Sequence, residues 1–168
     1  MNRFAILILA VLLGTTLFAG EHANKASEGF DKLKSLVGTW AGTTQDGKAV
    51  TVSYKLVSEG NVLMESLDKP GHAQTMITMY HVDGDRILMT HYCSVGNEPR
   101  MRAKSLSADG SKLSFTFLDI TNLDSPDAPH MHGLVFTFKD KDHMVQKWTM
   151  RAQGKDQAPA QFDLTRTN

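Results

Sequence analysis

The chain has 168 residues with 18 basic and 18 acidic side chains, so its formal net charge is zero. A neutral chain lacks the field that draws in nucleic acid or anionic lipid, and we expect neither as a partner. Its one cysteine, Cys93, excludes an internal disulfide, so packing must stabilise the fold.

The first 20 residues have the pattern of a secretory signal peptide. Arg3 precedes an apolar run over residues 4–13, and the small residues Ala19 and Gly20 close the segment. The apolar run is too short to cross a bilayer comfortably. We therefore expect cleavage after Ala19 or Gly20, a secreted or periplasmic mature protein, and no stable membrane anchor.

A short helix is expected before the first strand. Ser27 is a suitable N-cap and Gly38 a suitable stop. Between them, apolar residues recur at helical spacing: Phe30, Leu33 and Leu36 or Val37. This apolar face predicts that the helix packs against one end of the sheet that follows.

From Thr39 onward the apolar pattern changes to a period of two, which is typical of half-buried strands. With one strand after Gly38, the runs give about ten strands, at 50–56, 61–68, 74–82, 85–93, 99–107, 112–120, 132–139, 143–151 and 161–167. A meander of this size leaves bare edges unless it closes. We predict one all-β domain over residues 21–168, an antiparallel up-and-down barrel with the helix closing one end.

Two hairpins indicate which residues share a face. A two-residue loop at Asp83-Gly84 would pair Thr78 with Met89. In a later hairpin, two sets of alternating residues lie on one face of the sheet only if the loop between their strands has an odd number of residues, such as three. The residues concerned are Leu134, Phe136 and Phe138 on one strand and Met144, Gln146 and Trp148 on the next.

Gly38-Thr39-Trp40 resembles the Gly-x-Trp motif that opens the first strand of lipocalins. There an arginine from the last strand covers the tryptophan, so the resemblance implies a structural role for Trp40 and Arg166. The chain is similar to the calycin-type barrels (lipocalin, fatty-acid-binding and nitrobindin-like), and more closely to small secreted bacterial barrels without an assigned activity. The closer likeness rests on MYHVDGD (79–85), THYC (90–93), GNEPRM (96–101) and the stretch from HMH (130–132) through residue 148. It transfers no catalytic residue.

Methionine and aromatic residues at strand positions predict an adaptable apolar lining. Our first hypothesis is therefore a small hydrophobic ligand inside the barrel. Its expected contacts are Met76, Tyr80, Met89, His91, Phe115, Phe136 and Trp148. The same side chains would instead fill a barrel of narrow bore, and a filled barrel would serve as a protein-interaction module.

Histidines two residues apart supply the alternative hypothesis, a metal- or haem-dependent barrel protein, or an enzyme, that uses His91, His130 and His132. On a strand, His130 and His132 project from one face, and so do His91 and Cys93. Three imidazole nitrogens and a thiolate would satisfy a tetrahedral zinc site. Haem needs only one axial imidazole, for which the candidates are His91, His132 and His143.

No segment carries a specific catalytic signature. Cys93 has His91 two residues away, but such residues point the same way on a strand without necessarily touching, so we expect the thiol to act as a small buried apolar group. We therefore expect a binding protein without a cofactor rather than an enzyme.

Overall fold

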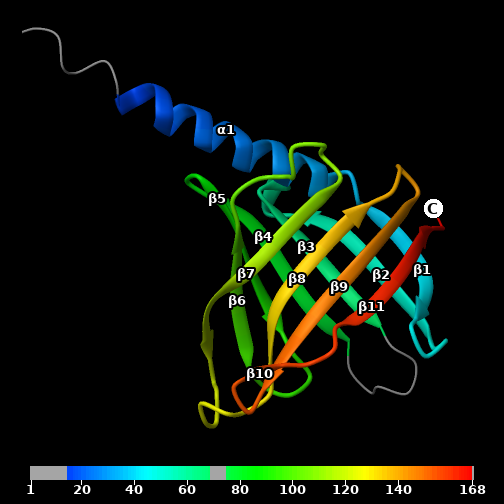
Figure 1. The fold of residues 1–168 in the computed structure, drawn as a ribbon. Coiled ribbons are helices and arrows are strands. Elements are labelled where there is room, and N and C mark those ends of the chain that lie inside the picture. Colours follow the sequence, from blue (N-terminus) through cyan, green and yellow to red (C-terminus); the bar gives the residue numbers. More distant parts are fainter. Residues whose placement is uncertain (1–14, 69–74, 168) are drawn as a thin grey trace, which may run out of the picture.

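The computed structural model describes residues 15–68 and 75–167, with side chains described from residue 25 onward. The helix α1 (Thr15–Lys34) precedes the strands (Figure 1). The strands are β1 (Gly38–Thr44), β2 (Ala49–Val57), β3 (Val62–Asp68), β4 (Met76–Asp83), β5 (Arg86–Tyr92), β6 (Glu98–Ala103), β7 (Lys112–Thr121), β8 (His130–Phe138), β9 (His143–Ala152), β10 (Lys155–Asp156) and β11 (Ala160–Arg166). A short 3-10 helix, η1 (Ser58–Gly60), joins β2 to β3.

Ten of these strands close into an antiparallel barrel. β1 to β8 pair in chain order, β8 pairs with β9, β9 pairs with β11, and β11 returns to β1. The two-residue β10 pairs only with the end of β9. The predicted fold class and the approximate number of strands are confirmed.

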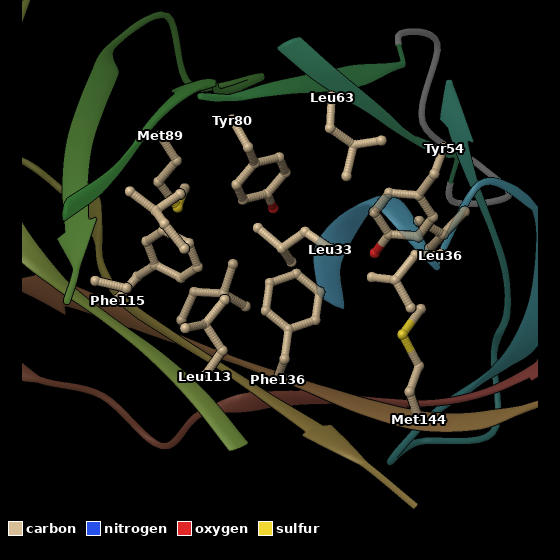
Figure 2. Packing of buried hydrophobic residues seen from close by; sticks show 14 of the residues in the cluster. Leu33, Leu36, Tyr54, Leu63, Tyr80, Met89, Leu113, Phe115, Phe136 and Met144 are labelled. Carbon is tan, nitrogen blue, oxygen red and sulfur yellow. The ribbon is translucent and has the colours of Figure 1, made fainter. Parts of the chain in front are cut away.

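The C-terminal half of α1 closes one end of the barrel. Phe30, Leu33 and Leu36 are buried, and Figure 2 shows Leu33 and Leu36 among the inward side chains of the strands. Gly29 lets the helix approach the wall closely, since a Cβ at this position would lie 2.9 Å from Ile87 Cδ1. The apolar face predicted from the sequence is the one that packs.

α1 begins earlier than the sequence predicts. Ser27 lies within the helix instead of capping it, and the helix extends back to Thr15. No proline interrupts residues 15–34, so helical hydrogen bonding can continue through the polar stretch. Of the predicted signal peptide, residues 1–14 lie outside the described part of the chain, and export stays a prediction. Among the described helices, none is long and apolar enough to span a membrane.

Trp40 and Arg166 attach the end of α1 to the barrel. The Arg166 guanidinium lies 4.3 Å from the centroid of the Trp40 ring. Trp40 Nε1 donates to the Leu36 carbonyl (2.8 Å), and Arg166 donates to the carbonyls of Ser35 (2.7 Å) and Val37 (2.8 Å). These three carbonyls belong to the segment between α1 and β1, so the first and the last strand of the barrel both hold this segment in place.

The pairing register decides which inward residues meet. β4 and β5 pair Thr78 with His91, so the predicted pairing with Met89 is wrong. The turn lies one residue later than predicted, which shifts the partners by two and keeps every side chain on its predicted face. The β8–β9 hairpin pairs Phe138 with Met144, which leaves five residues between them and meets the predicted condition for a shared face.

Side chains meet across the barrel axis in the part that α1 covers. The rings of Tyr80, Phe115 and Phe136 have centroids 5.6 to 6.3 Å apart, and Leu33 of α1 lies beside them (Figure 2). All four side chains are buried. This part of the barrel is therefore packed core.

Candidate functional site

Four polar side chains form a row across the inner wall of the barrel. Tyr54 on β2 pairs with Glu65 on β3, Glu65 with Thr78 on β4, and Thr78 with His91 on β5. None of the four is more than 3% exposed. Cross-strand partners on one face lie close together, so this polar row is continuous.

Glu65 is the centre of a hydrogen-bond network. Its Oε2 accepts from the Tyr80 hydroxyl (2.8 Å) and from Gln146 Nε2 (3.0 Å). Gln146 Nε2 also donates to the Tyr54 hydroxyl oxygen (2.5 Å), and Gln146 Oε1 accepts from Trp148 Nε1 (3.1 Å). Glu65 Oε1 is buried and has no partner among the described residues. The network connects β2, β3 and β4 with β9 across the interior.

Burial controls the protonation of this network. It raises the pKa of Glu65 to about 7, although hydrogen bonds from Tyr80, Tyr54 and Gln146 act in the opposite direction. Burial and the Glu65 charge raise the pKa of both tyrosines well above the ordinary range. At neutral pH the interior thus holds two neutral phenols and a carboxyl group poised between its two forms.

His91 ends the polar row. Its Nδ1 lies 2.9 Å from Thr78 Oγ1, and its ring packs on Trp148 with centroids 4.7 Å apart. Burial lowers the pKa of His91 to about 4, so the imidazole is neutral at pH 7. Its Nε2 is buried and has no partner among the described residues.

His91 and Thr78 share one hydrogen bond, and the neutral imidazole carries one hydrogen. With that hydrogen on Nδ1, the ring donates to Thr78 Oγ1 and Nε2 is a bare acceptor. With the hydrogen on Nε2, Nδ1 accepts from the Thr78 hydroxyl and Nε2 is a donor.

A small cavity adjoins His91 at the barrel end opposite α1. Its volume is about 40 Å³, and its lining is Leu67, Met76, His91, Met131, Trp148, Ala160 and Phe162. β11 reaches α1 at Arg166, so Ala160 at the other end of β11 marks the far end of the barrel. About 10–15 Å³ of such space holds one water molecule, so this cavity has room for a few heavy atoms.

The structure divides the predicted ligand contacts between the cavity and the core. Three of them line the cavity: Met76, His91 and Trp148. The other four are buried in the cluster of packed apolar residues: Tyr80, Met89, Phe115 and Phe136. A ligand in the cavity would therefore meet only the first group directly.

Three polar residues of the interior were not among the predicted site residues: Glu65, Thr78 and Gln146. The sequence does contain a sign of Glu65, because it alternates with Leu63 and Leu67 on the apolar face of one strand. Gln146 occupies the same kind of position between two inward apolar residues of β9. A polar residue on an apolar strand face is thus the pattern that points to this network.

The side chains considered for a zinc site do not come together. His91 faces the cavity, whereas His130 and His132 pack against Phe117. Cys93 is partly buried and lies just beyond the end of β5. Over the described residues, no group of three or more His, Cys, Asp or Glu side chains is placed to hold a metal ion.

The cavity does not fit a haem group. Of the three candidate axial ligands, His91 faces it, His132 packs on Phe117, and His143 is exposed beside Asp140, 2.9 Å away. Pockets that enclose drug-sized ligands measure about 300–1,000 Å³, far more than the space here. We therefore derive no haem chemistry from this site.

A larger recess of about 190 Å³ lies outside the barrel, where the β8–β9 turn meets β11. Four of its polar side chains form two pairs: His143 with Asp140 (2.9 Å) and Lys139 with Asp163 (3.6 Å). These groups are exposed to solvent. The recess therefore contains no buried group that a ligand would satisfy, in contrast to the cavity at His91.

Comparisons with known proteins support the fold alone. No family model matches this chain, and no curated protein matches it. Rv2717c from M. tuberculosis has a similar structure, with a TM-score of 0.60 and 17% identity over 83% of this chain and 98% of that one. A DUF3598-family protein of unknown function from Nostoc punctiforme gives a TM-score of 0.56 and 14% identity over 80% of this chain. This chain spans about half of that protein, 49% of its length.

Proposed function

We propose that this protein is an exported, lipocalin-like barrel that binds a small, mainly apolar molecule at the barrel end opposite α1. The observation that carries the proposal is His91 Nε2, a buried ring nitrogen that has no partner among the described residues and belongs to a residue that lines the cavity. Such an atom costs about 1–3 kcal/mol, which a hydrogen bond from a ligand would recover. The export part of the proposal depends on the pattern of residues 1–20.

The lining defines the chemistry of the ligand. Met76, Met131 and Phe162 are apolar, and no charged side chain belongs to the described lining. We assign the ring hydrogen to Nδ1, where it meets Thr78 Oγ1, so that His91 Nε2 accepts a hydrogen bond but has none to give. We therefore expect a neutral molecule with an apolar body and one hydroxyl or N–H group. Because methionine side chains are flexible, Met76 and Met131 can move to admit a body larger than the cavity.

Phenol and toluene are a matched pair of probes, because only phenol carries a donor. NMR spectra of the ¹⁵N-labelled chain report on Trp148 Nε1–H at the cavity and on Trp40 Nε1–H at the opposite end. We expect phenol to shift the Trp148 resonance in a saturable manner and to leave the Trp40 resonance in place. Toluene should bind several-fold more weakly, as expected for the loss of one hydrogen bond.

His91→Phe tests the acceptor. It keeps an aromatic ring beside Trp148 but removes Nε2, so phenol should bind no better than toluene. His143→Asn changes an exposed histidine outside the barrel and should leave phenol binding unchanged. If neither probe gives a saturable shift, the proposal fails and the filled barrel as a protein-interaction module becomes the better explanation. If His91→Phe binds phenol normally, the assigned acceptor is wrong.

A further inference from the structure

His130 and His132 bring two imidazole nitrogens together at the start of β8. His130 Nε2 lies 3.3 Å from His132 Nδ1, and the ring centroids are 5.4 Å apart. The pairing of β8 with β9 shifts register between Met131 and Gly133, so His132 occupies an irregular position. Met131 is the residue of this segment that lines the cavity, so the histidine pair is a separate feature.

The distance between these nitrogens suits a shared metal ion. In a tetrahedral zinc site each nitrogen lies about 2.0–2.1 Å from the ion, which places two of them about 3.3–3.4 Å apart. His130 Nε2 and His132 Nδ1 have this spacing, 3.3 Å. An ion bound by both nitrogens would take the place of the hydrogen bond between the two rings, and His132 would then carry its hydrogen on Nε2.

Neighbouring groups hold the two rings in place. His130 Nδ1 lies 2.9 Å from the Ala128 carbonyl and donates to it, so its Nε2 carries the lone pair. In the absence of an ion, His132 Nδ1–H donates to this lone pair. Metal-binding histidines commonly donate their second N–H to a carbonyl in this way. His132 stacks on Phe117 with centroids 4.4 Å apart and an interplanar angle of 20°. His130 is 5% exposed, so it has little side-chain freedom left to lose when an ion binds.

The charges near the pair are balanced. Arg151 and Asp156 both act on His132, and they form an ion pair with each other, 2.7 Å from Nε to Oδ1. Their charges therefore largely cancel at the histidines. Since the described residues contain no third ligand in place, the remaining coordination positions of an ion would be open to water or a small molecule.

We propose that His130 and His132 form a two-histidine binding site for a divalent transition metal, with Cu²⁺ bound more tightly than Zn²⁺. Imidazole is a good ligand for both ions, and the Irving–Williams order ranks Cu²⁺ above Zn²⁺. This site goes beyond the proposed ligand binding and does not depend on it, because the cavity and the histidine pair have no lining residue in common.

Copper titration of the full chain, followed by EPR, tests the site. The background carries Cys93→Ser, which removes a thiol that Cu²⁺ oxidises, and His22→Ala, which removes a histidine near the predicted cleavage position. We expect one Cu²⁺ per chain with hyperfine coupling to two imidazole nitrogens. Calorimetry should show Zn²⁺ competing for the same position with lower affinity.

Single variants assign the ligands. His130→Asn and His132→Asn should each weaken Cu²⁺ binding at least about tenfold, as expected when a ligand contact is lost. His81→Asn, at a partly exposed strand histidine on β4, is the control and should bind Cu²⁺ like the background protein. Circular dichroism checks folding, and His132→Asn decides the case if the buried His130 variant does not fold. Absence of 1:1 binding, coupling to fewer than two imidazoles, or unchanged affinity in His132→Asn would overturn the proposal.

Discussion

Glu65 and His91 respond to pH in opposite directions. Burial raises the pKa of Glu65 from 4.5 to about 7, so within this window the unfolded chain has released a proton that the folded chain keeps. The free energy of unfolding therefore falls as pH rises through the window. Burial lowers the pKa of His91 from 6.5 to about 4, so here the unfolded chain holds the extra proton and the free energy of unfolding rises with pH. The two effects oppose each other where the windows overlap.

Glu65→Gln removes one of these two effects. Glutamine still offers an acceptor to Tyr80 but does not titrate. Relative to the parent protein, the free energy of unfolding of the variant should rise by about 3 kcal/mol between pH 4.5 and pH 7, since one pKa unit corresponds to about 1.4 kcal/mol. Urea unfolding of both proteins at half-unit pH steps measures the difference, in which the shared exposed groups cancel. Parallel profiles would show that Glu65 titrates like an exposed carboxyl group.

For the residues in and around the polar row, the direction of a side chain could be predicted from the sequence, but its contacts could not. Alternation within a strand is local, so the inward direction of Tyr80 and Trp148 could be predicted. The contact between Thr78 and His91 depends on the position of a turn, and a difference of one residue there changed the predicted partner. Glu65 and Gln146 are 81 residues apart in the chain and meet only because the barrel closes.

At the scale of elements, the join between α1 and the barrel concentrates several interactions on one side chain. Arg166, at the end of β11, lies against Trp40 of β1 and donates to two carbonyls that follow the last turn of α1. The resemblance to lipocalins paired Trp40 with Arg166, and the two are in contact. The bonds to Ser35 and Val37 were not predicted, since no sequence pattern indicates which carbonyls a distant guanidinium reaches.

Arg166→Ala should lower the free energy of unfolding by about 2–4 kcal/mol. The change removes hydrogen bonds from a charged donor together with the contact to the Trp40 ring. Arg166→Lys keeps the positive charge but lacks the planar guanidinium with its several N–H donors. It should therefore recover less than half of the lost free energy of unfolding. Guanidinium chloride unfolding gives the values. Arg102→Ala, at an exposed arginine of β6, is the control and should change stability by less than about 0.5 kcal/mol. An Arg166→Ala protein as stable as this control would contradict the described join.

For the whole molecule, closure could be predicted but the contents of the barrel could not. Strand number follows from alternation and turn residues, which are local, and a meander of ten strands has to close or leave an edge. Whether the interior is open depends on the volumes of side chains that meet across the axis. Leu33 from α1 and the rings of Tyr80 and Phe136 are buried together beneath the helix, and the described cavity lies at the other end.

The seam between β1 and β11 completes the barrel and joins the first strand to the last. Gly42 pairs with Leu164 at this seam. A Cβ at Gly42 would lie 1.8 Å from the carbonyl oxygen of Asp163, which is backbone and cannot turn aside as a side chain can. Glycine is therefore required here by the close approach of the two strands.

Gly42→Ala should open the seam. The methyl group has to push β1 away from β11, so we expect a loss of more than about 3 kcal/mol in the free energy of unfolding, or a failure to fold. Gly133→Ala on β8 is the matched control, because its Cβ would meet Thr149 Cβ at an ordinary 3.7 Å, and stability should change by less than about 1 kcal/mol.

Urea unfolding compares the stability of the two variants, and amide hydrogen exchange shows which strands lose protection. If Gly42→Ala folds, the β1 and β11 amides should lose protection before those of β4 and β5, because closure at this seam is what holds the two outermost strands of the meander. Equal stability of the two variants, with β1 and β11 still protected, would mean that the strands approach less closely than described and that closure does not depend on Gly42.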